Sequence, residues 1–240
     1  MTDRMRTEFV QKESYVISDL LEIMRLLRSE NGCPWDREQT HASIRQSMIE
    51  EAYETADAID QQNKEMLCEE LGDVLLQVVF HAQIGQEDGT FCFDDVVDGI
   101  CKKLVERHPH VFGSVIAETS DAVLQNWEAI KQKSKHQNSV TDTLVAVPTA
   151  FPALMRAQKV QKRAAKSGRD VFATEHVFDE IHQKTDLLQK ETEQEKRFEL
   201  LGSLLLLVVG AARSMDLDCE LAMTRATDAF IENFAKNEIM

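Results

Sequence analysis

Four carboxylates in two pairs have a spacing that suits a metal site. Glu51 and Glu54 lie in the stretch EEAYE, and Glu70 and Asp73 lie in EELGD, so the members of each pair are three residues apart. Residues three apart on a helix project from the same face. In an antiparallel hairpin of two such helices the pairs face each other, and four oxygen ligands suit Mg²⁺, with Mn²⁺ as the alternative. Packed carboxylates repel one another without a cation, so the constellation predicts a metal.

The simpler interpretation places these acids on solvated helix faces, where most glutamates lie. The second pair, however, directly precedes the apolar run LGDVLLQVVFHA at Leu71–Ala82, which puts it at the border of a core. Gly72 adds weight, because an interior helical glycine costs about 1 kcal/mol relative to alanine and usually has a packing or functional reason. A di-iron site is the nearest chemical alternative. It needs Glu-x-x-His on two helices, whereas His81 lies eight residues beyond Asp73.

A cationic pair follows in CKKLVERHPHVFG, where Lys103 and Arg107 are four residues apart and share one helical face. One point charge and one planar fork suit phosphate oxygens. The alternative is that these charges only complement the carboxyl end of the helix dipole. His108 and His110 either contact a ligand or cap local carbonyls, and the sequence does not decide between these roles.

Three further residues are candidates for contact with a base. Trp35 lies in the loop NGCPWD, Gln39 follows it, and Trp127 lies on a later predicted helix. An indole can stack on a base, and an amide can pair with base edges. A packing role is the better single interpretation for either tryptophan.

The acidic balance excludes some partners. With 42 acidic and 27 basic residues, the net charge of -15 disfavours nucleic acid and anionic membrane as partners. A small polyanion such as a nucleotide differs, because it meets a cation that clustered carboxylates recruit.

No apolar run approaches the roughly 20 residues of a membrane span, and the start MTDRMRTEFVQKE lacks the apolar stretch of a signal peptide, so a cytoplasmic protein is expected. The five scattered cysteines are expected to be reduced thiols. A zinc site at Cys92, Cys101, His108 and His110 fits no common module.

An all-α fold is expected, because four prolines, nine glycines and few alternating β-branched runs leave little material for strands. The apolar run recurs 130 residues later as LGSLLLLVVGAA, which indicates a tandem duplication. The predicted domains are residues 1–135 and 150–240 with a linker at 136–149. Each repeat has one helix too apolar to face water, which predicts a homodimer. Helices are predicted at 12–29, 42–60, 64–86, 94–107, 121–135, 150–167, 174–193, 196–215 and 217–236.

Five motifs in order, GCPWDxxQTxxS, EEAYE, EELGDVLLQVVFHA, ERHPHVFG and LMRAQKVQKRAAKSG, resemble the MazG family of nucleoside triphosphate pyrophosphohydrolases. The resemblance covers the chain from about Asp19 to its end. It implies a dimer of tandem all-α repeats that uses Mg²⁺ to cleave ribo- and deoxynucleoside triphosphates between the α and β phosphates. By position, it implies metal ligands at Glu51, Glu54, Glu70 and Asp73, a phosphate-contacting pair at Lys103 and Arg107, and an aromatic near the nucleotide at Trp127. Glu50 and Glu69 flank the ligands, and either could orient or deprotonate water. Glu50, Glu51 or a neighbouring group is the expected proton acceptor.

The second repeat departs from this pattern. With Gly202 aligned on Gly72, Leu200 and Ser203 stand where Glu70 and Asp73 stand, and Glu180 and Gln183 correspond to Glu51 and Glu54. Ala229 and Asn233 replace the cationic pair. In well-known bacterial members of the family the second repeat carries the principal activity. The hypothesis here is therefore that the first repeat, residues 1–135, catalyses and that the second has lost its metal ligands. The alternative function is a non-catalytic nucleotide-binding regulator.

Overall fold

The structure is a computed structural model that describes residues 9–115, 139–168 and 176–238, together with 119–120, 122–123, 126–127, 130, 170 and 172. All regular elements of these residues are helices, which confirms the predicted all-α fold. The chain divides into two compact units, Met1–Glu118 and Thr119–Met240. The predicted domains at 1–135 and 150–240 stay a prediction, and the predicted helix at 121–135 lies largely outside the described residues.

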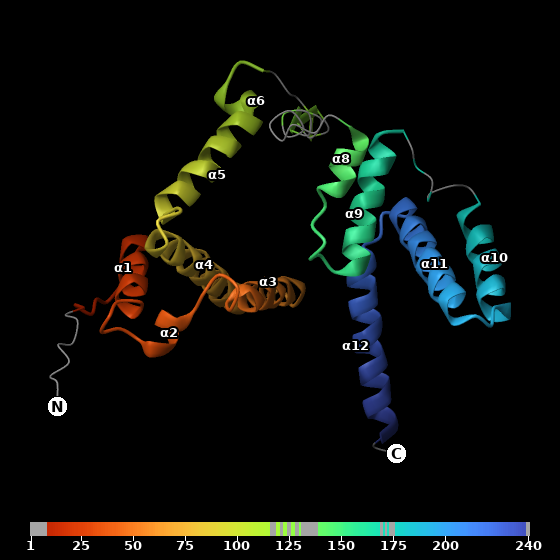
Figure 1. The fold of residues 1–240 in the computed structure, drawn as a ribbon, viewed down its shortest axis with the longest axis horizontal. Coiled ribbons are helices and arrows are strands. Elements are labelled where there is room, and N and C mark those ends of the chain that lie inside the picture. The colour runs from red at the N-terminus through yellow and green to blue at the C-terminus, as the bar shows by residue number, and fades with distance from the viewer. Residues whose placement is uncertain are drawn as a thin grey trace. The chain divides into compact units, whose positions relative to one another are not determined.

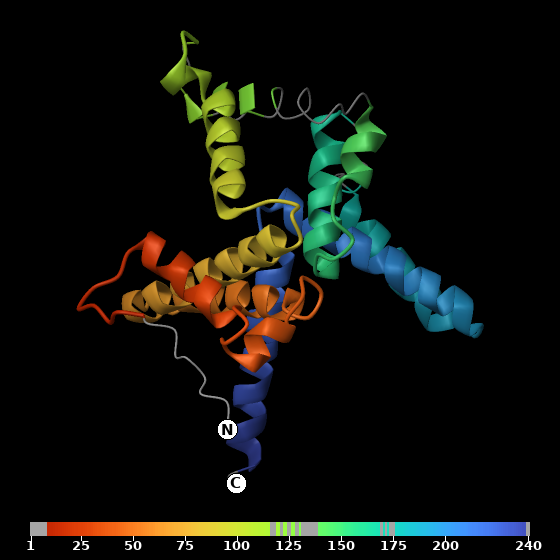
Figure 2. The ribbon, with the colours of Figure 1, turned by 60° about the vertical axis from the view of Figure 1, so that its left-hand side comes forward.

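The first unit is organised around one long helix, α4. Helices α1 and α3 pack along α4, while α5 contacts it only near the turn between them and then runs away from α3 in both views (Figures 1 and 2). Asn63 begins α4 by accepting hydrogen bonds from the backbone N–H groups of Glu65 and Met66 at 3.2 Å. The helices are α1 (Ile17–Leu27), α2 (Pro34–Glu38), α3 (Arg45–Asp60), α4 (Lys64–Glu87), α5 (Phe93–Arg107) and α6 (Pro109–Phe112).

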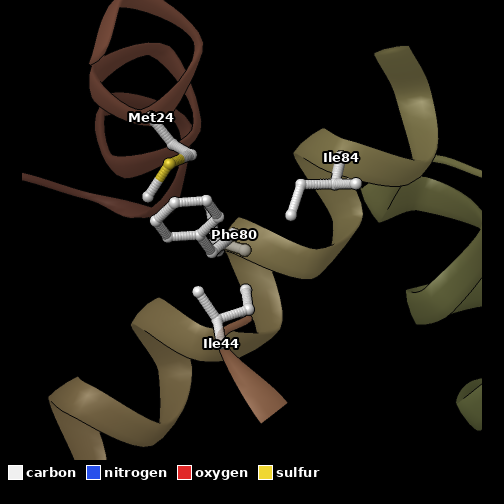
Figure 3. Packing of buried hydrophobic residues seen from close by; sticks show 5 residues of the cluster. Met24, Ile44, Phe80 and Ile84 are labelled. Carbon is white, nitrogen blue, oxygen red and sulfur yellow. The ribbon is translucent and has the colours of Figure 1, made fainter. Parts of the chain in front are cut away.

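The core of the first unit gathers on the second half of α4. Phe80 and Ile84 pack with Met24 of α1 and with Ile44, which directly precedes α3 (Figure 3). Val79 completes this buried cluster. Burying such side chains contributes roughly 1.5–3 kcal/mol each, so this cluster fixes the positions of α1 and α3 on α4.

A buried arginine ties the amino-terminal segments to the same helix. Arg28 donates hydrogen bonds to the carboxylate of Glu87, at 2.6 to 3.0 Å, and to the backbone carbonyl of Gln39 at 3.1 Å. Its guanidinium lies 5.3 Å from the centre of the Phe80 ring. Next to it the chain turns at Gly32, where a Cβ atom would lie 2.2 Å from the Leu27 carbonyl oxygen. Glycine is therefore required at that position.

The described part of the second unit contains a second helical hairpin and three further helices, α8, α9 and α12. Helix α10 packs against α11, and α9 packs against α8, α11 and α12. Helix α8 falls in the predicted linker and begins at Ser139, whose hydroxyl accepts from the Asp142 N–H at 3.0 Å. A local cap thus forms a helical turn where no period was visible. The helices are α8 (Val140–Val145), α9 (Ala153–Lys166), α10 (Val177–Lys190), α11 (Gln194–Ser214) and α12 (Cys219–Glu238).

The central helix of each unit exposes apolar side chains to solvent. Leu71 and Leu75 of α4 are 51% and 39% exposed. Leu201, Leu205 and Val208 of α11 are 45%, 43% and 44% exposed. The spacing i, i+4, i+7 places the α11 residues on one stripe. Such stripes are typical of helices that pair with another surface.

Among the described residues, no single helix is both long and apolar enough to cross a membrane. One bent pair, residues 194–214 and 219–236, meets the length and composition criteria jointly across a 104° bend.

Candidate metal centre

The two carboxylate pairs are brought together by the hairpin of α3 and α4. Helix α3 ends at Asp60 and α4 begins at Lys64, so only residues 61–63 connect them. Gln62 occupies the left-handed region at φ 55°, which reverses the chain. The hairpin therefore places EEAYE opposite EELGD, as the sequence spacing required.

Three of the four predicted ligands converge at this interface. Glu51, Glu70 and Asp73 are half-buried, and each offers a carboxylate oxygen within 4.8 Å of the others. The fourth, Glu54, is more exposed and lies close enough to Glu51 and Glu70 to raise the pKa of both. Among the described residues, this is the one group of three or more acidic, histidine or cysteine side chains that is close enough for a metal ion.

The electrostatics of the cluster are those of a cation site. Partial burial first, and then the neighbouring carboxylates Asp73, Glu54 and Glu70, raise the pKa of Glu51. Partial burial and the same kind of repulsion, from Glu54, Asp73 and Glu69, raise the pKa of Glu70. Carboxylates whose charges oppose one another are stabilised when a divalent cation is shared among them. All-oxygen donors at this spacing fit Mg²⁺ or Mn²⁺.

The two acids that flank the cluster lie toward solvent. Glu50 is exposed on α3 and accepts a hydrogen bond from the Gln46 amide at 3.1 Å, one turn earlier. Glu69 is exposed on α4 and reaches the cluster only through its charge, which acts on Glu70. The position of Glu50 leaves its carboxylate accessible to a substrate or to water.

The predicted cationic pair lies on a different part of the unit. Lys103 is exposed on α5, whereas Arg107 is 8% exposed at the end of that helix. The segment that carries them points away from α3 (Figures 1 and 2). Every charged group that shifts the pKa values of Glu51 and Glu70 is itself a carboxylate. Within a single chain the structure does not bring these two cations to the carboxylates.

The candidates for base contact have diverse environments. Trp35 is 61% exposed on α2, so packing does not occupy its ring. Gln39 uses its amide locally, donating to the Trp35 carbonyl at 2.8 Å and accepting from the Ser43 hydroxyl at 2.8 Å. Trp127 is half-buried and belongs to the second unit.

A histidine pair in the first unit, of which His81 lies eight residues beyond Asp73 along α4, was not singled out from the sequence. The Nδ1 atoms of His41 and His81 lie 2.7 Å apart, so one donates and the other accepts, and the two rings stack with centroids 5.1 Å apart. Partial burial and the charge of His41 lower the pKa of His81. Forty residues separate the two in sequence, so no local pattern reveals their contact. The pair links the entry of α3 to α4 and so helps to position the carboxylates.

The corresponding hairpin of the second unit lacks this chemistry. Ser203 of α11 donates its hydroxyl to the carbonyl of Glu199 at 2.9 Å, within its own helix. Leu200 precedes it at the place of Glu70, and Gln183 of α10 is exposed. Glu180 is the one carboxylate at the four aligned positions.

These features define an all-α protein with a cluster of carboxylates between two antiparallel helices. The MazG nucleotide pyrophosphohydrolase domain matches residues 39–112, which include the whole α3–α4 hairpin and α5. Two relatives extend the similarity to almost the whole chain. The nucleoside triphosphate pyrophosphohydrolase of Escherichia coli (strain K12) is 43% identical over 228 residues, which are 92% of this chain and 87% of that protein.

The second relative is the nucleoside triphosphate pyrophosphohydrolase/pyrophosphatase MazG of Thermotoga maritima. It is 38% identical over 229 residues, which are 95% of this chain and 88% of that protein. A shorter match, 43% identical over 152 residues, joins 62% of this chain to 45% of the nucleoside triphosphate pyrophosphohydrolase of Mycobacterium tuberculosis. The chain belongs to the MazG nucleotide pyrophosphohydrolase family, which confirms the resemblance seen in its motifs and its assignment as a hydrolase.

Proposed function

We propose that this protein hydrolyses nucleoside triphosphates to the monophosphate and pyrophosphate, with Mg²⁺ held by the carboxylates of α3 and α4. The observation that carries the proposal is the convergence of Glu51, Glu70 and Asp73 within 4.8 Å, inside the segment that matches the family. Glu54 is the fourth ligand. The relatives named above support the reaction, since their names state it for them.

Each residue of the site has a distinct role. A bound Mg²⁺ supplies Lewis acidity toward phosphate oxygens and toward water. The ligands Glu51, Glu54, Glu70 and Asp73 hold the metal, and Glu50 accepts a proton from the attacking water because its carboxylate lies toward solvent beside the ligands.

Catalysis belongs to the first repeat alone. A single aligned carboxylate, Glu180, remains in the second hairpin, and Ala229 and Asn233 stand where the first repeat has its cations. One carboxylate without cationic partners is a poor site for a metal–triphosphate complex. The apolar pattern of α11 survives instead, as expected for a helix retained for packing.

The active form is a homodimer in which a second copy completes the site. Three groups of exposed apolar side chains support this. Two are Leu71 and Leu75 of α4 and the stripe on α11. The third is Phe230, Ile231 and Phe234 of α12, which are 68%, 59% and 56% exposed. Exposed apolar patches of this kind commonly cover one another in an oligomer. Because α5 points away from the carboxylates of its own chain, Lys103 and Arg107 are proposed to neutralise phosphate charge at the site of the partner.

The central experiment measures pyrophosphate release from a panel of ribo- and deoxynucleoside triphosphates, with Mg²⁺, with Mn²⁺ and with EDTA. Wild type is compared with Glu70→Gln, which keeps the shape of the side chain but removes its charge. Metal-dependent release that is lost in Glu70→Gln is the expected result. Glu65→Gln is the matched control, because it neutralises an exposed glutamate on the same helix outside the cluster.

The panel also separates this function from its alternative. If wild type binds triphosphates in Mg²⁺ and returns them unhydrolysed, the protein is a nucleotide-binding regulator and the proposal is wrong. The panel reports the preferred base and sugar in the same measurement.

Mixing two inactive variants tests the shared site. Glu70→Gln lacks a ligand and Lys103→Ala lacks a cation, so each homodimer is expected to be impaired. In a mixed dimer with sites shared between chains, one site carries both defects and the other carries neither, so activity returns. If each chain forms its own site, the mixture stays as inactive as its components. Gel filtration of the wild type gives the oligomeric state independently, and a monomeric mass contradicts the dimer.

A further inference from the structure

A second concave site lies in the second unit and has the opposite charge from the metal centre. A cavity of about 370 Å³ runs along one face of α9 and ends at the turn that begins α12. Its volume falls in the range of small-molecule pockets. It is lined by Met155, Gln158, Lys159, Lys162, Arg163, Lys166 and Asp218.

The cations of this face are unusual for so acidic a protein. Helix α9 carries five basic residues and no acidic one, whereas the whole chain has 27 basic and 42 acidic residues. Charge complementing the helix dipole accounts for the last turn, with Arg163 and Lys166, but not for Lys159 and Lys162. Among residues 139–168 and 176–238, no carboxylate forms an ion pair with Lys159 or Lys162. These two side chains are exposed at the cavity.

The walls of the cavity are fixed by hydrogen bonds between distant segments. The Gln158 amide donates to the Leu217 carbonyl at 2.8 Å and accepts from the Cys219 N–H at 3.1 Å, which locks α9 to the turn before α12. On the other side, Arg163 donates to the Thr143 carbonyl of α8. These bonds hold the basic face of α9 against the turn before α12 and against α8 before any ligand arrives.

The one carboxylate of the lining, Asp218, accepts a hydrogen bond from a backbone N–H group. Asp218 accepts from the Leu221 N–H at 2.9 Å, at the first turn of α12. Lys159, Lys162 and Arg163 line the cavity beside it, so positive charge exceeds negative charge in the lining even before Lys166 is counted.

We propose that this cavity binds a phosphate chain, either of a nucleoside phosphate or of an inorganic polyphosphate. Lys159 and Lys166 are seven residues apart, about 10 Å along the helix axis, which is enough to follow two or three linked phosphates. Lysine ammonium groups and the Arg163 guanidinium donate charge-assisted hydrogen bonds to such oxygens. Met155 and the lysine stems offer apolar surface on which a nucleoside can rest.

This second site is independent of catalysis, and metal-free conditions isolate it. In EDTA the carboxylates of α3 and α4 repel phosphate, whereas the α9 cavity needs no metal. Calorimetric titration of the full-length protein with ATP and with tripolyphosphate, at low salt, therefore measures the cavity. We expect saturable binding of one anion per chain that weakens as salt is added.

The variants assign that binding to particular residues. The double variant Lys159→Gln with Lys162→Gln keeps the apolar stems and removes two charges, and it should weaken binding at least about tenfold. Lys190→Ala, an exposed lysine of α10 away from the cavity, should bind as wild type does. Equal affinity for both ligands means that the phosphate chain alone is recognised, whereas tighter ATP binding means that the nucleoside is contacted too.

Two results overturn the proposal. One is the absence of saturable binding of either anion, and the other is binding that persists in the α9 double variant but disappears in Lys103→Ala, which would place the anion in the first unit. Because hydrolysis requires metal and this titration excludes it, loss of hydrolysis and loss of this binding are separate outcomes.

Discussion

The two helical hairpins of this protein share a packing scheme but differ in their polar edge. In α3–α4 and in α10–α11 the second helix is the apolar centre of its unit, and Val79 and Val209, 130 residues apart, are both only 1% exposed. Leu71 and Leu75 have exposed counterparts in Leu201 and Leu205. At the aligned positions beside these leucines, however, Glu70 and Asp73 of α4 correspond to Leu200 and Ser203 of α11.

This difference separates what packing requires from what chemistry requires. An apolar stripe on α11 persists because it must be covered whether or not the hairpin catalyses. The acids of α3 and α4 repel one another, as the raised pKa values of Glu51 and Glu70 indicate. Such a cluster costs stability unless a cation compensates the repulsion. The presence of the cluster in one hairpin and its absence in the other is what makes a metal role for the first hairpin the better interpretation.

Matched substitutions at Asp73 and Ser203 test this comparison with the largest expected effect. Asp73→Asn removes a ligand charge and should lower kcat/KM at least about a hundredfold, because metal binding is worth several kcal/mol to the reaction. Ser203→Ala removes a hydroxyl that only bonds its own helix, and it should leave activity unchanged. Steady-state pyrophosphate release measures both. Full activity in Asp73→Asn, or a comparable loss in Ser203→Ala, contradicts the assignment of catalysis to the first repeat.

The catalytic role of Glu50 predicts a different kinetic signature from that of a ligand. Glu50→Gln should lower kcat roughly 10²-fold or more, as expected for loss of a general base, while Mg²⁺ binding stays as in wild type. Metal titration followed by calorimetry, beside Asp73→Asn, separates the two roles. A Glu50→Gln variant that has lost metal binding would make Glu50 a ligand, and one with normal kcat would leave the proton acceptor to another group.

Local patterns in the sequence predicted the hairpin and its acids but not how the rest of the unit surrounds them. The spacing within EEAYE and EELGD is a property of single helices, and the short link at residues 61–63 allows one arrangement of the two. The contacts of Arg28 with Glu87 and of His41 with His81 join residues 59 and 40 positions apart, and no periodicity encodes them.

Short elements and faces also escaped the sequence. The helical turn α8 depends on one cap at Ser139, within a stretch too short to show a period. Gly72 has open space around its Cα, since a Cβ there would meet no atom within 4 Å, so the expected packing reason does not lie in its own chain. The position of α5 relative to the carboxylates depends on packing between distant segments, which no local pattern reports.

One arginine in each unit allows a comparison of stability. The side chain of Arg28 is 6% exposed and contacts a carboxylate, backbone carbonyls and the Phe80 ring. The side chain of Arg213 is 14% exposed and pairs with Asp170. Arg28→Met removes the cation that pairs with Glu87, which keeps only the Gln83 amide as a donor, and it removes the donor to the Gln39 carbonyl. It should therefore lower the free energy of unfolding by about 2–3 kcal/mol, and Arg213→Met by about 1–2 kcal/mol. Urea denaturation followed by circular dichroism measures both. An equal or reversed order would mean that the first unit is not anchored through Arg28.

The smallest effect concerns the pH dependence of stability without metal. The pKa values of Glu51 and Glu70 are raised in the folded protein, so between the ordinary and the raised values the folded state binds more protons than the unfolded state. The free energy of unfolding in EDTA therefore falls as pH rises through that window and is larger on its acidic side. Glu70→Gln should flatten this slope and raise the midpoint of urea unfolding at neutral pH, because it relieves repulsion, although it abolishes activity.

Saturating Mg²⁺ should stabilise wild type and not Glu70→Gln. The second hairpin has no such cluster, so Glu180→Gln is the control and should leave the slope unchanged. Because the lowered pKa of His81 adds a contribution of opposite sign, the deciding quantity is the difference in slope between wild type and Glu70→Gln, and the absence of a difference contradicts repulsion within the cluster.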